Sequence, residues 1–403
     1  MQKHFDVVIS GGGLSGTLMA LSLSSCKYKD GTALSIAIIE ANPIHQDASL
    51  SFDDRVLALS HGTAAYLNHV GVWQHLESNA QPIETIHISD RGHYGKARIK
   101  AEDHQVAALG YVAKMSDIGK CLLTELSTKN NITWFAPDTI DGIEWQQEQV
   151  NIRLTSEQLI TTPLLLGCDG AKSACRQFAN IDSQTIAYEQ SALIANVACS
   201  LPHNNIAYER FTQTGPIAML PLSPLSQNKA QGHCSLVWTL THELAHQYSQ
   251  LDDNAFKKEL NNAFGHWLGE ITKVGKRDIY PLNLVQAKEQ VYHRMVLIGN
   301  ASHTIHPIAG QGFNLGVRDV EQLTQVITQA LSIGQDIGQF SLLSDYAVTR
   351  KTDHNAVITL TDSLVTLFSN DLFPLVVGRN IGLKVLNYVT PFKKAFVSKT
   401  MGY

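Results

Sequence analysis

Short apolar runs, each closed by a glycine or an acidic residue, recur along the chain. The first two are FDVVIS at 5–10 and SIAIIE at 35–40, and the stretch LMALSLS between them has the character of a helix. The segment CKYKDGT, rich in lysine and turn residues, separates this helix from the second run. The pattern therefore predicts a buried strand, a glycine-rich turn, a helix, a surface loop and a second buried strand.

Another part of the chain shows strand-like stretches separated by turn residues. Residues 83–100 predict paired strands around the turn Asp90-Arg91-Gly92, and residues 193–240 repeat this style between Pro, Asn, Gln and Gly. Together they indicate an antiparallel sheet. Because runs of the first kind lie on both sides of it, we expect the sheet to be an inserted second domain with a substrate-binding face.

Helical spacing dominates the last third of the chain. A helix is predicted after the glycine-rich turn at 310–312, and a largely helical tail, apolar on one side, is predicted over residues 354–403. The apolar positions of the helix are Val317, Val320, Leu323, Ile327, Ala330 and Leu331, and those of the tail are Val357, Leu360, Leu364 and Leu367.

These elements predict an α/β fold: a Rossmann-like dinucleotide-binding domain, an inserted α+β domain with an antiparallel sheet, and a helical C-terminal region. We expect the first domain to be discontinuous, because its strands and helices flank the inserted sheet. Its predicted segments are 1–80, 101–180 and 276–335, those of the second domain are 81–100 and 181–275, and the helical region is 336–403.

Composition narrows the classes of function. Of 403 residues, 44% are hydrophobic and 17% charged, and the net charge of -5 lacks the basic excess that nucleic-acid binding requires. The six cysteines form no CxxC pair and the 17 histidines no HExxH pair, so we expect neither disulfides nor a metal site. No apolar run approaches the ~18 residues that span a bilayer, and little chain precedes the first strand, so we expect a cytoplasmic protein without a signal peptide.

The glycines after the first strand form the first motif that indicates a ligand-binding site. Gly11, Gly13 and Gly16 form GxGxxG between a buried strand and a helix. The first permits a tight turn, the second lets the backbone approach a pyrophosphate, and the third allows close helix packing. Glu40, at the end of the second strand, is placed to accept hydrogen bonds from ribose hydroxyls. The motif alone leaves FAD and NAD open, and an exposed glutamate after an ordinary turn is the plain alternative.

Two further segments bring in a known family. They are LLLGCDGAKSACR at 164–176 and VLIGNASHTIHPIAGQGFNLGVRD at 296–319. With GxGxxG and Glu40 they resemble the three fingerprints of the single-component flavin-dependent aromatic hydroxylases, typified by para-hydroxybenzoate hydroxylase. HPIAGQGFNLGVRD is closer to the ubiquinone-biosynthesis hydroxylases, and the resemblance runs nearly end to end. Within these, SDRGHYG, AEDHQVAALG, AYERFTQTGPIAMLP and PLVVGRNIGL resemble the branch that acts on 2-polyprenyl-6-methoxyphenol.

The resemblance implies tightly bound FAD, which makes the first domain an FAD-binding domain. Arg55 would contact the FAD ribose or pyrophosphate, since guanidinium pairs well with phosphate oxygens. Asp169 and Gly170 would lie near the pyrophosphate and the route of the nicotinamide. Asn300, beside Gly299, stands where most members have an aspartate that binds the ribityl chain; the amide keeps an acceptor but loses the charge. The alternatives are a surface arginine, an ordinary turn and a turn-capping asparagine.

The same resemblance brings the turn before the last predicted helix against the flavin. Backbone amides at that helix N-terminus would stabilise the negative charge of reduced flavin. His303 and His306 are equally well interpreted as structural histidines. The implied cofactor contacts are Gly310, Gly312, Phe313 and Asn314, and His306, Pro307 and Gln311 would lie at the reactive face.

A reaction is implied as well. NAD(P)H or another donor would reduce the flavin, dioxygen would add to give a flavin hydroperoxide, and an electron-rich polyprenylated phenol would attack it. The protein would exclude water and orient the ring, and a basic group in the pocket would take up the phenol proton. The candidate pocket residues, for which plain sheet core is the alternative, are Arg210, Phe211, Met219, Pro221 and Trp238.

A polyprenylated substrate implies peripheral contact with the cytoplasmic membrane and with other ubiquinone-biosynthesis proteins. The apolar tail between Val357 and Val389 is one candidate for the membrane contact, and a helical cover over the domain interface is the interpretation we favour. The alternative functions are a hydroxylase acting at another ring position, a halogenase- or reductase-type flavoenzyme, and a non-catalytic flavoprotein subunit of the biosynthetic complex.

Overall fold

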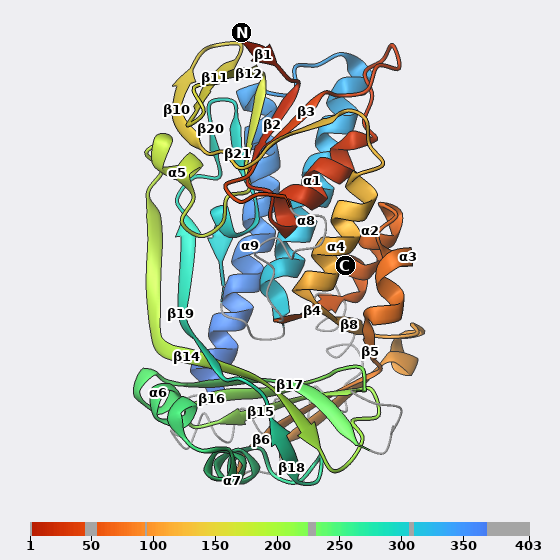
Figure 1. The fold of residues 1–403 in the computed structure, drawn as a ribbon, viewed down its shortest axis with the longest axis vertical. Helices are drawn as coiled ribbons and strands as arrows, with labels where there is room; N and C mark the ends of the chain where they lie inside the picture. The colour runs from red at the N-terminus through yellow and green to blue at the C-terminus, as the bar shows by residue number, and fades with distance from the viewer. Residues whose placement is uncertain (1, 45–54, 93–94, 225–230, 306–309, 369–403) are drawn as a thin grey trace.

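The computed structural model describes residues 2–44, 55–92, 95–224, 231–305 and 310–368. A parallel sheet with its helices forms one end of the molecule and a large, mainly antiparallel sheet forms the other (Figure 1). Two long strands run between these ends, and a small sheet of order β4-β8-β5 lies where they meet. These elements are β14 (Ser183–Cys199), β19 (Asp278–Ala287), β4 (Val56–Ser60), β8 (Gly110–Lys114) and β5 (Gln81–Ile83).

The parallel sheet is buried on both faces, which explains the uninterrupted apolar runs in its sequence. Its strand order is β20-β21-β13-β2-β3-β9, with β20 antiparallel at one edge. Alternate side chains point to opposite faces, so Val7 and Ile9 pack on one side of the sheet and Val8 on the other. The strands are β2 (Val7–Ser10), β3 (Ile36–Ile39), β9 (Ile132–Phe135), β13 (Leu164–Gly167), β20 (Val291–Tyr292) and β21 (Met295–Leu297).

Helices cover one face of the parallel sheet and a second small sheet covers the other. Helix α1 lies between α4 and α8, and all three contribute to the core that contains Val7 and Ile9. The opposite core joins Val8 to the sheet of order β1-β12-β11-β10 and to α5. The bounds are α1 (Leu14–Ser24), α4 (Met115–Leu126), α8 (Gln311–Ile333), α5 (Ala174–Phe178), β1 (Lys3–His4), β10 (Ile140–Trp145), β11 (Val150–Leu154) and β12 (Leu159–Thr162).

The large sheet follows the order β22-β19-β14-β17-β16-β15-β6-β7, and β18 also pairs with β14. The predicted hairpin around Asp90-Arg91-Gly92 is confirmed as β6 and β7. Helices α6 and α7 cover one face. Strands β19 and β22 lie in this sheet although the sequence grouped residues 276–335 with the other domain; the domain limits stay predictions. The bounds are β6 (Thr85–Asp90), β7 (Lys96–Lys100), β15 (Ile206–Thr212), β16 (Gly215–Pro221), β17 (Gly232–Thr241), β18 (Ile271–Val274), β22 (His303–Thr304), α6 (His242–Gln250) and α7 (Asp253–Phe264).

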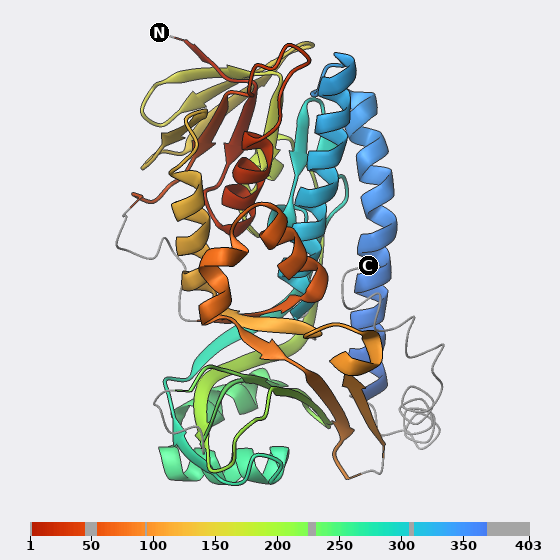
Figure 2. The ribbon, with the colours of Figure 1, turned by 90° about the vertical axis from the view of Figure 1, so that its right-hand side faces the viewer.

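Two long helices run side by side along the molecule (Figure 2). The helix predicted after residues 310–312 is α8, and the predicted helical tail corresponds to α9 (Phe340–Phe368) as far as residue 368. Val357 of α9 is buried against Leu284 and Leu315, so this part of the tail packs internally. Residues 369–403, with Val389, lie outside the described residues. Short helices elsewhere are α2 (His61–His69), α3 (Trp73–Leu76), η1 (Glu77–Asn79), η2 (Ala101–His104) and η3 (Gly299–Ala301).

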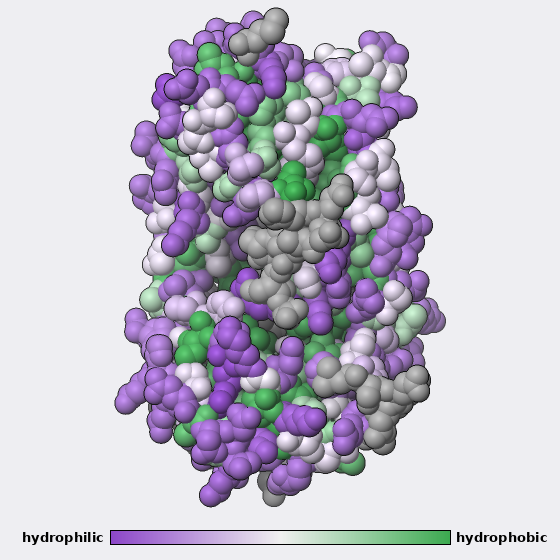
Figure 3. Space-filling model, in the orientation of Figure 1, coloured by the Kyte–Doolittle hydropathy of each residue, from purple (hydrophilic) through white to green (hydrophobic). Residues whose placement is uncertain are grey.

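One face of the molecule is largely polar. Hydrophilic residues make up most of the face shown in Figure 3, with apolar groups scattered among them. Within the described ranges, no helix combines the length and apolar character required to cross a membrane.

A buried charged cluster joins α8 to α9. Asp319 of α8 is fully buried, and its Oδ1 accepts hydrogen bonds from Arg350 Nε and His354 Nε2, each at 2.7 Å. Burial by itself would raise the pKa of Asp319, but the charge and hydrogen bond of His354, with His303 and Arg350, hold that pKa below its ordinary value. With Arg350 beside it and two hydrogen bonds to its Oδ1, the Asp319 carboxyl is expected to be ionised in the folded protein.

Asp319→Asn tests this cluster. The substitution removes the carboxylate that accepts from Arg350 and His354, while Arg350 keeps its ion pair with Asp353 at 2.8 Å. We therefore expect a loss of about 2–3 kcal/mol in the free energy of unfolding, measured with urea. Asp345→Asn, on the exposed side of α9, is the matched control and should change it by less than about 0.5 kcal/mol. Equal effects of the two variants would contradict the interpretation.

His303 makes stability depend on pH. Burial lowers the pKa of His303 to about 3, whereas an unfolded histidine titrates near ~6.5. The folded state therefore binds fewer protons, and the contribution of His303 is fully present above pH ~6.5 and is lost progressively as the pH falls toward 3. Between pH 7 and 5.5 the loss should be about 1.3 kcal/mol, and His303→Gln should remove this part of the pH dependence in unfolding measurements. An unchanged slope in the variant would show that His303 is not its source.

Candidate active site

Segments far apart in the sequence meet at one edge of the parallel sheet. Strand β2 runs parallel to β3 and β13, and β13 runs parallel to β21. The residues that follow these strands therefore emerge together at their carboxyl ends. The backbone N–H of Gly12 donates to Glu40 Oε2 at 2.7 Å, which ties the first turn to the end of β3. The structure thus brings together the turns that contain Gly11, Glu40, Asp169 and Gly299.

Each of the three glycines Gly11, Gly13 and Gly16 is required for a different structural reason. Gly11 has φ +101°, and a Cβ there would lie 2.6 Å from the carbonyl oxygen of Cys168. A Cβ on Gly16 would lie 1.9 Å from the Gly11 oxygen, so the helix could not approach the turn. Gly13 has an extended backbone (φ -70°, ψ -173°) and no atom within 4 Å of a Cβ. Glycine at 13 thus keeps space open rather than satisfying the apoprotein's own packing.

That open space lies at the N-terminus of α1. Gly13 is the N-cap residue and supplies no side-chain hydrogen bond to the first turn. Uncapped amides at a helix N-terminus, with the helix dipole, form a favourable site for phosphate. The arrangement fits the pyrophosphate of a dinucleotide.

Two carboxylates at this edge fit the hydroxyls of such a ligand. Asp169 Oδ2 accepts from the backbone N–H of Cys175 at 2.9 Å, while Oδ1 is buried and receives no hydrogen bond from any described residue. A buried carboxylate oxygen left unpaired is costly, so a ligand donor there would be stabilising. Glu40 Oε1 accepts from Asn42, and its oxygens retain lone pairs for ribose hydroxyls. Asn300 is exposed in η3 at the same edge.

Two glycines lie beside these carboxylates, and each leaves room that a side chain would occupy. Gly299 has φ +59°, and a Cβ there would lie 2.8 Å from Ser15 Oγ of α1. Gly170 has φ +79° and no atom within 4 Å of a Cβ, so it leaves space beside Asp169. The turns with Gly11, Glu40, Asp169 and Gly299 therefore lie together at one edge of the sheet, and we call this edge the cradle; that it contacts a cofactor stays a prediction.

The start of α8 is held against β4 by one side chain. Asn314 is buried; its Oδ1 accepts from the backbone N–H of Ser60 at 2.8 Å, and its Nδ2 donates to the carbonyl oxygens of Ala58 and Gly310. Its amide group is therefore engaged within the protein, which leaves only its backbone for a cofactor. Gly310 itself has φ +63° and would clash through a Cβ with Ala58 at 2.9 Å.

Other predicted residues of this turn have mixed surroundings. Helix α8 begins without a side-chain cap, so its first amides are available to a ligand. Gln311 is buried, Gly312 has ordinary space around it, and Phe313 packs on the core between sheet and helices. His306 and Pro307 lie outside the described residues.

A cavity of about 280 Å³ lies between this region and the large sheet. Arg55 lines it, with its guanidinium 4.8 Å from the centre of the Tyr280 ring. Among the described residues around it, Arg55 and Glu209 are the charged side chains and most of the others are apolar. The lining residues are Arg55, Val56, Leu57, Ala58, Ile83, Ile86, Met115, Ile194, Ala207, Tyr208, Glu209, Ala218, Leu220, Ser235, Val237 and Gly310.

Strand alternation puts most of the predicted pocket residues on the opposite face of the sheet. Met219 and Trp238 belong to the core beneath α6 and α7. Arg210 lies near Gly265 at the end of α7, where a Cβ on Gly265 would be 3.2 Å from its Nη1. Along β16, Pro221 points to the same face of the sheet as Met219. Along β15, Phe211 points to the same face as Glu209. Pro221 and Phe211 are both buried, and neither lines the cavity. A substrate role for these five stays a prediction.

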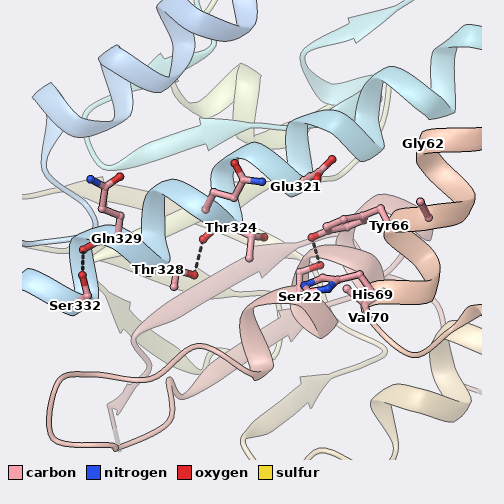
Figure 4. A pocket seen from close by; sticks show the side chains of 12 residues that line it. Ser22, Gly62, Tyr66, His69, Val70, Glu321, Thr324, Thr328, Gln329 and Ser332 are labelled. Atoms are coloured by element: carbon pink, nitrogen blue, oxygen red, sulfur yellow. Dashed lines mark hydrogen bonds between the residues drawn. The ribbon is translucent and has the colours of Figure 1, made fainter. Parts of the chain in front are cut away.

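A larger cavity of about 700 Å³ lies elsewhere, among α1, α2 and α8 (Figure 4). Most of its lining residues have polar side chains, and several hydroxyl groups are already paired: Tyr66 donates to Ser22 Oγ at 2.8 Å, and Thr328 to the Thr324 carbonyl at 2.7 Å. Ser22 is two helical turns beyond the N-terminus of α1 that forms the cradle. This cavity is therefore separate from the candidate active site.

Comparison with known proteins identifies the family. The sequence matches the FAD binding domain family over residues 4–361, most of the chain. The chain belongs to this FAD-binding family. It is an FAD-dependent monooxygenase with the α/β fold predicted from its sequence, and FAD is the cofactor that the cradle fits.

Relatives of this flavoprotein cover nearly its full length. Ubiquinone hydroxylase UbiL from Rhodospirillum rubrum is 32% identical over 99% of this chain and 90% of its own. The mitochondrial ubiquinone biosynthesis monooxygenase COQ6 of Homo sapiens is 31% identical over 98% of this chain and 92% of its own. In fold, the chain is similar to p-nitrophenol 4-monooxygenase PnpA from Pseudomonas putida, with a TM-score of 0.79, 16% identity and coverage of 100% and 99%.

Sequence reasoning missed Glu209 as a cavity residue, although it named both following residues. The signal was available in the alternation of β15: Ala207 and Glu209 share one face, and Tyr208 and Arg210 share the other. What the sequence alone does not tell is which face α6 and α7 cover.

Gly13→Val separates cofactor binding from folding. Valine can adopt the extended backbone of Gly13, and no protein atom lies within 4 Å of a Cβ there, so the free energy of unfolding of the apoprotein should change by less than about 0.5 kcal/mol. The added side chain would occupy the approach of the pyrophosphate, so the purified variant should contain no FAD by visible absorbance. Retained FAD would show that the pyrophosphate lies elsewhere.

Proposed function

We propose that this flavoprotein acts in ubiquinone biosynthesis, hydroxylating 2-polyprenyl-6-methoxyphenol to 2-polyprenyl-6-methoxy-1,4-benzoquinol with NAD(P)H as reductant and dioxygen as co-substrate. This is the activity of the 2-octaprenyl-6-methoxyphenol hydroxylase type. The observation that carries the proposal is the apolar cavity beside Gly310, at the start of α8. The relatives named for ubiquinone hydroxylation and ubiquinone biosynthesis support the pathway.

The size of the cavity suits the ring of such a substrate. At about 280 Å³ it is at the lower limit of small-molecule pockets, which are typically ~300–1,000 Å³. A substituted phenol ring fits this space, whereas a polyprenyl chain of many isoprene units exceeds it. The polyprenyl chain of the substrate is thus expected to extend from the cavity into the surroundings. This is consistent with delivery of the substrate from a membrane surface or from partner proteins of the pathway.

The cavity walls supply what a ring hydroxylation requires of the protein. When bound, FAD supplies the activation of dioxygen. Ile194, Ala218 and Val237 present an apolar surface that excludes water and positions the ring. The first backbone amides of α8 lie at the positive end of the helix dipole, which would stabilise negative charge on the pyrimidine end of the flavin. Arg55, at the cavity edge, is placed to pair with a phosphate or a phenolate.

The decisive experiment is to purify the protein, record flavin absorbance, and identify the precursor that accumulates when the gene is deleted. The proposal expects a yellow protein and accumulation of 2-polyprenyl-6-methoxyphenol. A colourless protein that cannot be reconstituted with FAD would contradict cofactor-dependent oxidation. A different accumulated phenol would favour hydroxylation at another ring position.

Ala218→Phe tests the location of the substrate. Ala218 faces the cavity from β16, so a phenyl ring there fills space that the substrate ring needs. We expect KM for a short-chain methoxyphenol to rise about tenfold or more while FAD content is unchanged. Ala218→Ser, which hardly alters the volume, is the control. Unchanged steady-state hydroxylation kinetics in both variants would place the substrate elsewhere.

A further inference from the structure

Glu209 lines the candidate substrate cavity, and no described residue forms a hydrogen bond or an ion pair with its carboxyl. Glu209 lies in β15, and its neighbours in register are Ile88 on β6 and Ala218 on β16. Neither neighbour has a polar side chain, and no hydrogen bond from a described residue reaches the Glu209 carboxyl. Placing a carboxylate without a hydrogen-bond partner on this largely apolar sheet face is costly.

The cavity offers little to neutralise that carboxyl. Among the described residues that line it, Arg55 before β4 is the other charged group and Ser235 on β17 offers a hydroxyl. Tyr208 of β15 also lines it, and the remaining walls, from β4, β5, β6, α4, β14, β15, β16 and β17, are apolar. Glu209 is therefore the group in the cavity that can accept a proton from a bound ligand.

We propose that Glu209 is the base that removes the proton from the hydroxyl of the phenol bound in this cavity, an inference that rests on the proposed function. The phenol O–H bond breaks and leaves its electron pair on oxygen, and a new O–H bond forms on the Glu209 carboxylate. No electron is transferred in this step. The phenolate is the more electron-rich form of the ring, which is the form that attacks an electrophilic oxygen.

The electrostatic environment supports this role. Burial raises the pKa of Glu209 to about 7, closer to the value of ~10 for a phenol than an ordinary glutamate at ~4.3. A base is most effective when its pKa lies near the working pH and near that of the acid it serves. The carboxylate form, and with it the rate, should rise as the pH increases through about 7.

Glu209→Gln tests the step because it removes the base and keeps the shape. The FAD-loaded protein is assayed by single-turnover product formation with 2-methoxy-6-methylphenol and with its more acidic 3,5-difluoro derivative. For the first phenol we expect a loss of about 100-fold or more at pH 7.5, recovered as the pH rises toward the pKa of the phenol. The difluoro phenol, which ionises more readily, should show a much smaller loss.

Binding provides a readout that does not depend on turnover. Calorimetric titration with 4-fluoro-2-methoxy-6-methylphenol, blocked at the position to be hydroxylated, should give tighter binding to wild type at pH 8 than at pH 6. An ionised carboxylate accepts a stronger hydrogen bond from the phenol than a protonated one. The affinity of Glu209→Gln should be the same at both pH values.

Matched variants separate this role from a structural one. Glu243→Gln removes the same charge from α6 on the other side of the sheet, at an exposed position, and should behave as wild type. Glu209→Asp keeps a carboxylate and should retain the rise in rate with pH at a reduced rate. FAD content and unfolding midpoint confirm that each variant is folded.

The outcomes distinguish the two levels of the proposal. Equal losses for both phenols in Glu209→Gln, or pH-independent binding to wild type, would overturn the role of Glu209 while leaving phenol hydroxylation intact. A wild-type protein that hydroxylates neither phenol would overturn the proposed function and this inference with it.

Discussion

Parallel pairing of β2, β3, β13 and β21 is the constraint on which the site depends. Each strand comes from a different part of the chain, yet all end at the same edge because they run in the same direction. The turns after them carry uncapped amides, tight glycines and the unpaired oxygen of Asp169. Moving any one strand out of register by a residue would turn its buried side chains to the other face and displace its turn from the cradle.

Contacts between elements then place the cradle against the large sheet. Asn314 joins the start of α8 to β4 through hydrogen bonds to Ser60, Ala58 and Gly310, and the same stretch of β4 lines the cavity. Farther along α8, the buried charges of Asp319 and Arg350 fasten it to α9. One helix thus joins the cavity wall at its start to α9 farther along, which couples the position of that wall to the packing of the C-terminal region.

The two faces of the large sheet have separate tasks. One face packs beneath α6 and α7 and holds the large side chains Met219 and Trp238. The other carries smaller residues such as Ala207 and Ala218, which leave the cavity open, together with the Glu209 carboxyl. Aromatic and methionine side chains therefore pack in the core on one face, while small residues and one acid line the cavity on the other.

Local sequence determined the strands, the helices α1 and α8, and the glycine-rich turns at the strand ends, because apolar runs, helical spacing and glycine chemistry act over a few residues. GxGxxG, Glu40 and Asp169 were recognisable for that reason. The pocket was not, since every β-strand offers two faces and only the packing of distant helices decides which is covered. Only the tertiary structure shows that Glu209 lines the cavity, that Met219 and Trp238 lie in the core, and that the Asn314 amide forms hydrogen bonds within the protein.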